Sequence, residues 1–269
     1  MAPFRMFLEF LAELFWRRHL ITELTRRDFK SGYLGSYLGV LWAFLLPIIL
    51  TVVFWFVFQV GYGTPPVNGY PFVLWFVCGM FAFNFLQECI SNGTDAILQN
   101  VFIVKKVTFS VGILPIIKIL SALIIHLFFI ALICFMLLAS GHGFGLHVLQ
   151  VAYYLGAAIV FVTGVTFLTS AVVVFFRDLK QLVGIIMQIS FFMTPIFWSP
   201  QIIPERYRLL INFNPFYYIV QGYRDSFMNG AWFWEHPFMT LYFWTLTTFV
   251  FVSGAVVFRR LRPHFADVL

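Results

Sequence analysis

Long apolar stretches alternate with short polar breaks along most of this chain. A helix needs about 20 apolar residues to cross a hydrocarbon layer about 30 Å thick. The pattern predicts six membrane spans, at about 33–60, 71–90, 111–139, 148–176, 182–198 and 237–258. Pro47 lies inside the first span and should kink it, because proline removes a backbone hydrogen bond.

The first thirty residues have a different pattern. Apolar side chains recur at helical spacing over 4–15, with charged side chains on the opposite side. This is typical of an amphipathic helix in the membrane surface, the alternative being a helix packed on a partner protein. We therefore divide the chain into an interface helix with a basic linker, 1–30, and a transmembrane domain, 31–269.

The segment between the fifth and sixth spans mixes polar and apolar residues. Pro204 and Pro215 stand where helices can begin, Asn214 can cap the second helix, and Gly230 can end it. We predict two short helices, at about 204–211 and 215–228. Because 204–229 is too short for two further spans, we expect it to re-enter the membrane as a gate.

Composition agrees with an all-α integral membrane protein. Hydrophobic residues make up 61% of the chain and charged residues only 10%, against about 25% in soluble domains. With six spans, fourteen of the seventeen Lys and Arg residues fall on the side of both termini. Since loops rich in Lys and Arg stay in the cytoplasm, both termini are predicted to be cytoplasmic and the gate external.

Several motifs extend through the chain in order. They read RRDFKSGYLGSYLGVLW at 26–42, LPIIK at 114–118, FFRDLKQ at 175–181, MTPIFWSP at 193–200 and NPFYYIVQGYRD at 214–225. By these motifs the chain resembles the transmembrane subunits of ABC-2 type polysaccharide exporters. FWFVFQVGYGTPPVNGYPFVLW at 54–75 and the C-terminal stretch from 232 look most like wall teichoic acid export permeases, although O-antigen and capsule permeases share most of the motifs.

The resemblance implies a homodimer in the bacterial cell membrane that exports a lipid-linked polysaccharide. Each copy would bind one ATPase subunit through a coupling helix at about 94–102, where Thr94 or Asn92 could cap a short helix from Asp95 to about Phe102. The chain contains no GxxxxGK[ST] phosphate-binding loop, so we expect no catalytic site and no cofactor on it. ATP and Mg²⁺ would be bound by the partner subunit, and nucleic acid is not expected as a partner.

Candidate site residues follow from charge, aromatic character and the resemblance. The substrate path would include Tyr33, Tyr37, Trp42, Arg206, Arg208 and Arg224. The lipid-diphosphate entrance would include Arg26, Arg27 and Lys30, and the ATPase coupling residues would be Thr94, Asp95, Ile97, Leu98, Val101 and Phe102. Guanidinium groups can bind phosphate, and aromatic rings can stack on sugars. The alternatives are ion pairing, orientation by positive charge, and anchoring at the membrane interface.

Two polar residues lie inside apolar spans. For Glu88 we favour an ion pair with Lys105 or Lys106, and for His126 a hydrogen bond in the core. The three cysteines have no metal-binding spacing and are expected to be small core residues. Competing functions are export of another amphiphile, a membrane transferase and an ion-coupled carrier. The last two lack the clustered acids or repeated broken helices that they would need.

Overall fold

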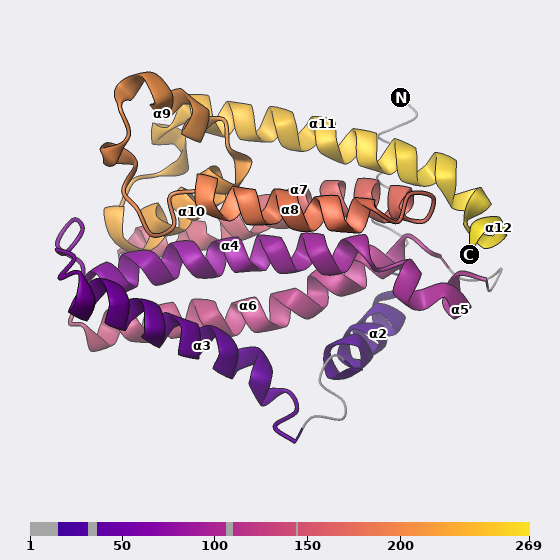
Figure 1. The fold of residues 1–269 in the computed structure, drawn as a ribbon, viewed down its shortest axis with the longest axis horizontal. Coiled ribbons are helices and arrows are strands. Elements are labelled where there is room, and N and C mark those ends of the chain that lie inside the picture. The colour runs from indigo at the N-terminus through magenta and orange to yellow at the C-terminus, as the bar shows by residue number, and fades with distance from the viewer. Residues whose placement is uncertain (1–15, 32–36, 106–109, 144) are drawn as a thin grey trace.

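The computed structural model describes residues 16–31, 37–105, 110–143 and 145–269 (Figure 1). All regular elements within these residues are helices, apart from one β-bridge between Val67 and Tyr70. The predicted interface helix at 4–15 lies outside the described residues, as does Tyr33.

Five helical segments are long and apolar enough to cross a membrane. They are α3 (Leu41–Trp55) with the π-helical turn η1 (Phe56–Gly61), α4 (Phe72–Thr94), α6 (Ile113–Ala139), η3 (Leu146–Gln150) with α7 (Val151–Val173), and α11 (Pro237–Leu261) followed by η7 (Arg262–His264) and α12 (Phe265–Val268). These confirm an all-helical membrane architecture for the described part of the chain.

The fifth predicted span is shorter than expected. Helix α8 (Leu179–Met193) has 15 residues and is about 23 Å long, less than the hydrocarbon thickness of about 30 Å. It was predicted to continue to Trp198 but ends at Met193. Thr194 is extended because it precedes Pro195, whose ring disfavours a helical conformation in the residue before it.

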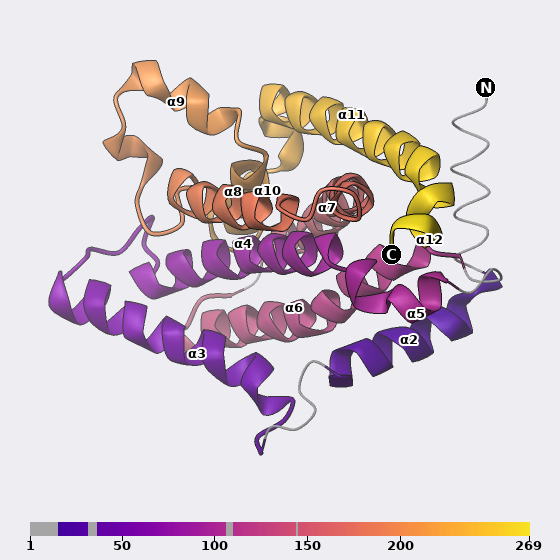
Figure 2. The same cartoon turned by 45° about the vertical axis from the view of Figure 1, so that its right-hand side comes forward.

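Helix α2 (Arg18–Ser31) occupies a region that we had assigned to a linker. Its Asp28 accepts a 2.5 Å hydrogen bond from Lys118 Nζ and a 2.9 Å bond from Ser121 Oγ, both on α6. These bonds attach α2 to the beginning of α6, beside the lower end of α3 in Figure 2.

Helix α4 forms the centre of the bundle, between α6 and α8 (Figures 1 and 2). Most of its side chains are buried, including those of Phe76, Phe83 and Leu86. Helices α7 and α11 cross very closely at Gly164 and Gly254. A Cβ atom on Gly254 would lie 2.3 Å from the carbonyl oxygen of Gly164, so only glycine fits there.

The two short helices after α8 are present. Helix α9 (Glu205–Asn212) and helix α10 (Pro215–Arg224) follow the 3-10 turn η4 (Pro200–Ile202). Asn214 caps α10, since its Oδ1 accepts a 3.0 Å bond from the amide of Phe216. The π-helical turn η5 (Asp225–Asn229) extends α10 to Gly230, which has the expected left-handed conformation with φ of 71°. The 3-10 turn η6 (Phe233–Glu235) leads into α11.

Candidate transport path and coupling surface

The segment after α4 lies at one end of the bundle, opposite α9 (Figure 1). It was predicted to be one helix, about 95–102, capped at Asn92 or Thr94, and this is wrong. Helix α4 continues to Thr94, whose hydroxyl donates to Ile90 O at 2.7 Å and lies at hydrogen-bond distance, 2.8 Å, from Thr169 Oγ1. A turn, the 3-10 helix η2 (Leu98–Asn100) and α5 (Val101–Val104) follow, because Asn100 has a non-helical backbone conformation.

The coupling residues divide into buried and exposed groups. Thr94, Asp95 and Ile97 are buried, and Asp95 Oδ2 pairs with Lys180 Nζ at 2.5 Å at the beginning of α8. Leu98 and Val101 are half-buried. Phe102 is 90% exposed, so of these six residues it offers the largest free apolar surface to a partner.

The proposed entrance residues lie on α2. Arg26, Arg27 and Lys30 are all exposed, whereas the intervening Asp28 turns toward α6. Tyr37 is also exposed and Trp42 is 43% exposed at the start of α3. These positions leave the basic and aromatic side chains accessible.

The three arginines of the gate lie in different surroundings. Arg206 on α9 is exposed, with its guanidinium 4.7 Å from the centre of the Tyr207 ring. The side chain of Arg208 is outside the described part. Arg224, which we had placed in the substrate path, has 0% exposure and cannot contact a substrate in this conformation.

Arg224 instead joins three segments. Its Nε donates to Trp75 O at 3.2 Å, and its two other nitrogens donate to Pro195 O at 2.6 Å and Ile196 O at 2.9 Å. The guanidinium lies 3.5 Å from the centre of the Trp75 ring. A Cβ atom on Gly79 would approach Arg224 to 2.5 Å, so this glycine makes room for the arginine. We found no sequence signal for this role of Gly79 and Trp75.

A groove of about 260 Å³ opens between α3, α4 and α6. Its lining includes Trp42, Asn84, Glu88 and His126 among apolar side chains. His126 Nε2 lies 2.7 Å from Tyr223 Oη, which confirms the expected core hydrogen bond. The predicted pair between Glu88 and Lys105 does not form, and Lys106 lies outside the described residues.

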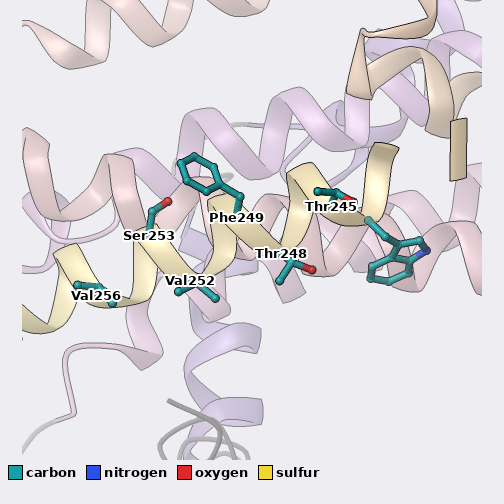
Figure 3. Close-up of a pocket in the computed structure, with 7 residues that line it drawn as sticks. Thr245, Thr248, Phe249, Val252, Ser253 and Val256 are labelled. Carbon is teal, nitrogen blue, oxygen red and sulfur yellow. The ribbon is translucent and has the colours of Figure 1, made fainter. Parts of the chain in front are cut away.

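A second hollow, of about 730 Å³, follows one face of α11 (Figure 3). Thr245, Thr248 and Ser253 give it a partly polar lining. The Thr245 hydroxyl donates to Leu241 O at 2.7 Å and the Ser253 hydroxyl to Val250 O at 3.0 Å. Because their hydrogens are used within α11, these two hydroxyls do not indicate a ligand site.

Known proteins resemble this chain over nearly its full length. Two proteins named O-antigen export system permease protein RfbA, both from Klebsiella pneumoniae, are 27% and 25% identical to it, each over 93% of this chain and 95% of its own length. The protein of the same name from Myxococcus xanthus is 25% identical, over 97% and 99% of the two chains. The sequence profile described as ABC-2 type transporter matches residues 19–228. A match over this much of the sequence places the chain in the ABC-2 type transporter family, as a membrane permease.

Proposed function

We propose that this chain is the membrane subunit of an ATP-driven exporter of a lipid-linked polysaccharide. The observation that carries the proposal is the full-length similarity to polysaccharide export permeases, joined to an exposed Phe102 at one end of the bundle. The chain itself has no catalytic role, and a separate ATPase binds ATP and Mg²⁺.

The proposed topology has six spans in a bacterial cell membrane, with both termini cytoplasmic. Helix α8 serves as the fifth span together with the extended residues that follow it. Helices α9 and α10 form the external re-entrant gate. The charge asymmetry of the sequence supports this orientation, since Lys and Arg concentrate at the cytoplasmic side.

The proposed assembly is a homodimer with two ATPase subunits. Apolar side chains on α3 and α8 are widely exposed within one chain, including Val53, Ile186 and Phe192. Contact between two copies would cover part of these faces and place α3 and α8 beside the substrate path. Tyr33, Tyr37, Trp42, Arg206 and Arg208 remain the proposed path residues, and Arg26, Arg27 and Lys30 the entrance.

Two polymers come into consideration. The named relatives favour O-antigen, whereas the stretch at 54–75 looks more like teichoic acid permeases. Teichoic acid carries phosphate in every repeat, so its export should depend strongly on Arg206 and Arg208. Transport of each polymer, measured separately in vesicles given ATP, would separate the two. Replacing both arginines by glutamine should then slow export of the phosphate-rich polymer more than export of the neutral polymer. Equal effects would remove these arginines from the path.

The central test concerns Phe102. We expect Phe102→Asp to reduce both transport and ATPase stimulation in vesicles, since a charge would replace the apolar contact with the ATPase. Leu146→Asp is a matched control, because Leu146 is also a widely exposed apolar residue but lies beyond the far end of α6. Normal coupling in Phe102→Asp would contradict the proposed docking site.

A further inference from the structure

The groove between α3, α4 and α6 holds two polar side chains without partners. Neither the Glu88 carboxylate nor the Asn84 amide makes a hydrogen bond or ion pair within the described part of the chain. They lie one helical turn apart on α4 and both line the groove. A carboxylate in apolar surroundings is costly unless a donor or a cation meets it. A ligand with a hydrogen-bond donor or a positive charge would therefore suit this groove.

The remaining lining limits what that ligand can be. Trp42, Phe81, Phe85 and Phe129 line the groove, and aromatic rings can attract a cation. His126 is not free to bind through Nε2, which is engaged by Tyr223. No Lys or Arg lines the groove, so a phosphate placed beside Glu88 would be repelled. A primary ammonium suits both the carboxylate and the amide oxygen, because it offers three donors.

Size and position favour a lipid head group over a saccharide chain. The volume of about 260 Å³ is below the range of about 300–1,000 Å³ typical of pockets for drug-sized ligands. Glu88 lies six residues before the end of α4, or about 9 Å along the helix from that end. Trp42 and Leu46, on the α3 side of the groove, are 43% and 55% exposed, so acyl chains can lie against this wall.

Helix α2 supplies the complementary charge for a lipid phosphate. It is attached to α6 at Lys118 and Ser121, and the adjacent Ala122 already lines the groove. Arg26, Arg27 and Lys30 on α2 are exposed at this end of the bundle. A head group with an ammonium at one end and a phosphate at the other matches an acidic groove beside a basic helix.

We propose that this groove binds the primary ammonium of an aminophospholipid such as phosphatidylethanolamine, with Glu88 and Asn84 as acceptors and Trp42 as an aromatic wall. The lipid is a resident of the groove and is distinct from the exported polymer, although the site shares Trp42 and the basic residues of α2 with the proposed substrate path and entrance. This site goes beyond the export function and does not depend on which polymer is exported.

Native mass spectrometry of the full-length permease can test the site. The protein would be released from nanodiscs containing equal amounts of phosphatidylethanolamine, phosphatidylcholine and phosphatidylglycerol with identical acyl chains. We expect wild type to retain phosphatidylethanolamine about tenfold more than either other lipid, the ratio corresponding to one hydrogen bond to a charged group. Phosphatidylcholine has no N–H donor and phosphatidylglycerol has no cation.

Variants then assign the preference to the groove. Glu88→Gln should abolish it, while Glu88→Asp, which keeps the charge, should retain most of it. Gln87→Leu is the matched control, since Gln87 is exposed, adjacent in sequence and absent from the groove lining. Equal retention of the three lipids by wild type would overturn the proposal. So would a preference that survives in Glu88→Gln, one that is lost in Gln87→Leu, or displacement of the bound lipid by a lipid-linked saccharide.

Discussion

Helices α3 and α4 are consecutive and both apolar, yet they lie in opposite surroundings. The segment containing α3 is the more apolar, but only 6% of an 18-residue apolar stretch of it is buried, against 78% of the corresponding stretch of α4. Lipid tails are as apolar as leucine, so hydrophobicity alone does not draw a helix into the interior of a membrane protein. Close packing and polar contacts do, and α4 has both, at Gly79 with Arg224 and at Gly93 with Thr166.

The same contrast separates two sets of helices. The interior set is α4, α7 and α10, whose side chains are largely buried, and the outer set is α3 and α8, whose side chains are largely exposed. If packing rather than hydropathy distinguishes the two sets, equivalent substitutions should have very different effects in them.

The largest difference is expected for glycines. Gly164→Ala on α7 would place Cβ 2.7 Å from the Phe251 backbone on α11, whereas Gly184→Ala on α8 meets nothing within 4 Å. We expect Gly164→Ala to lower the free energy of unfolding by about 3 kcal/mol, as overpacking does, and Gly184→Ala to leave it unchanged. Reversible unfolding in mixed detergent would measure both. Similar changes in unfolding free energy for the two variants would contradict the distinction between interior and outer helices.

The next largest difference concerns two arginines. Arg224→Met would leave three buried carbonyl groups without the arginine donor, at a cost of about 3 kcal/mol. Arg206→Met on the exposed α9 should change thermal stability little. The midpoint of thermal unfolding of the purified permease would compare them, and a stable Arg224→Met protein would show that the loop after α8 does not need this anchor.

The smallest effect is expected where the two sets meet. Lys180 on α8 pairs with Asp95 beyond α4, but the lysine side chain is 65% exposed, so the pair should contribute only about 0.5 kcal/mol. Lys180→Met should lose this amount, Asp95→Asn should lose a similar amount, and the double variant should lose less than the sum of the two. A double-mutant cycle on unfolding free energies would measure the coupling. Additive effects would mean that the outer helix is not held at this point.

Periodicity and turn residues predicted much of the fold. Five of the apolar stretches became long helices, and Pro215, Asn214 and Gly230 marked the beginning, cap and end of the α10 region because their backbone preferences act locally. The end of α8 could also have been placed correctly, since Thr194 precedes a proline. Helix α2 was missed because its many charged residues are typical of a linker. The contacts that fix this helix, from Asp28 to Lys118 and Ser121, join residues far apart in the sequence.

Long-range contacts account for the errors at the candidate site. Arg224 looked like an external cation, and only its distance to Trp75, Pro195 and Ile196 identifies it as an interior anchor. Thr94 looked like a helix cap, but its hydroxyl is already bonded to Ile90 and Thr169. In both cases the sequence allows several bonding partners for the side chain, and only the folded structure shows which of them lies close enough to bond.

The anchor at Arg224 also bears on how the protein is made. Trp75 and Arg224 are 149 residues apart, so α4 is synthesised long before the side chain that fills the space beside Gly79. The carbonyl groups of Pro195 and Ile196, made 29 and 28 residues before Arg224, also lack their donor until Arg224 is added. The nascent permease therefore contains an incomplete interior until α10 emerges from the ribosome, and a chain truncated before residue 224 should be a substrate for membrane quality-control proteases.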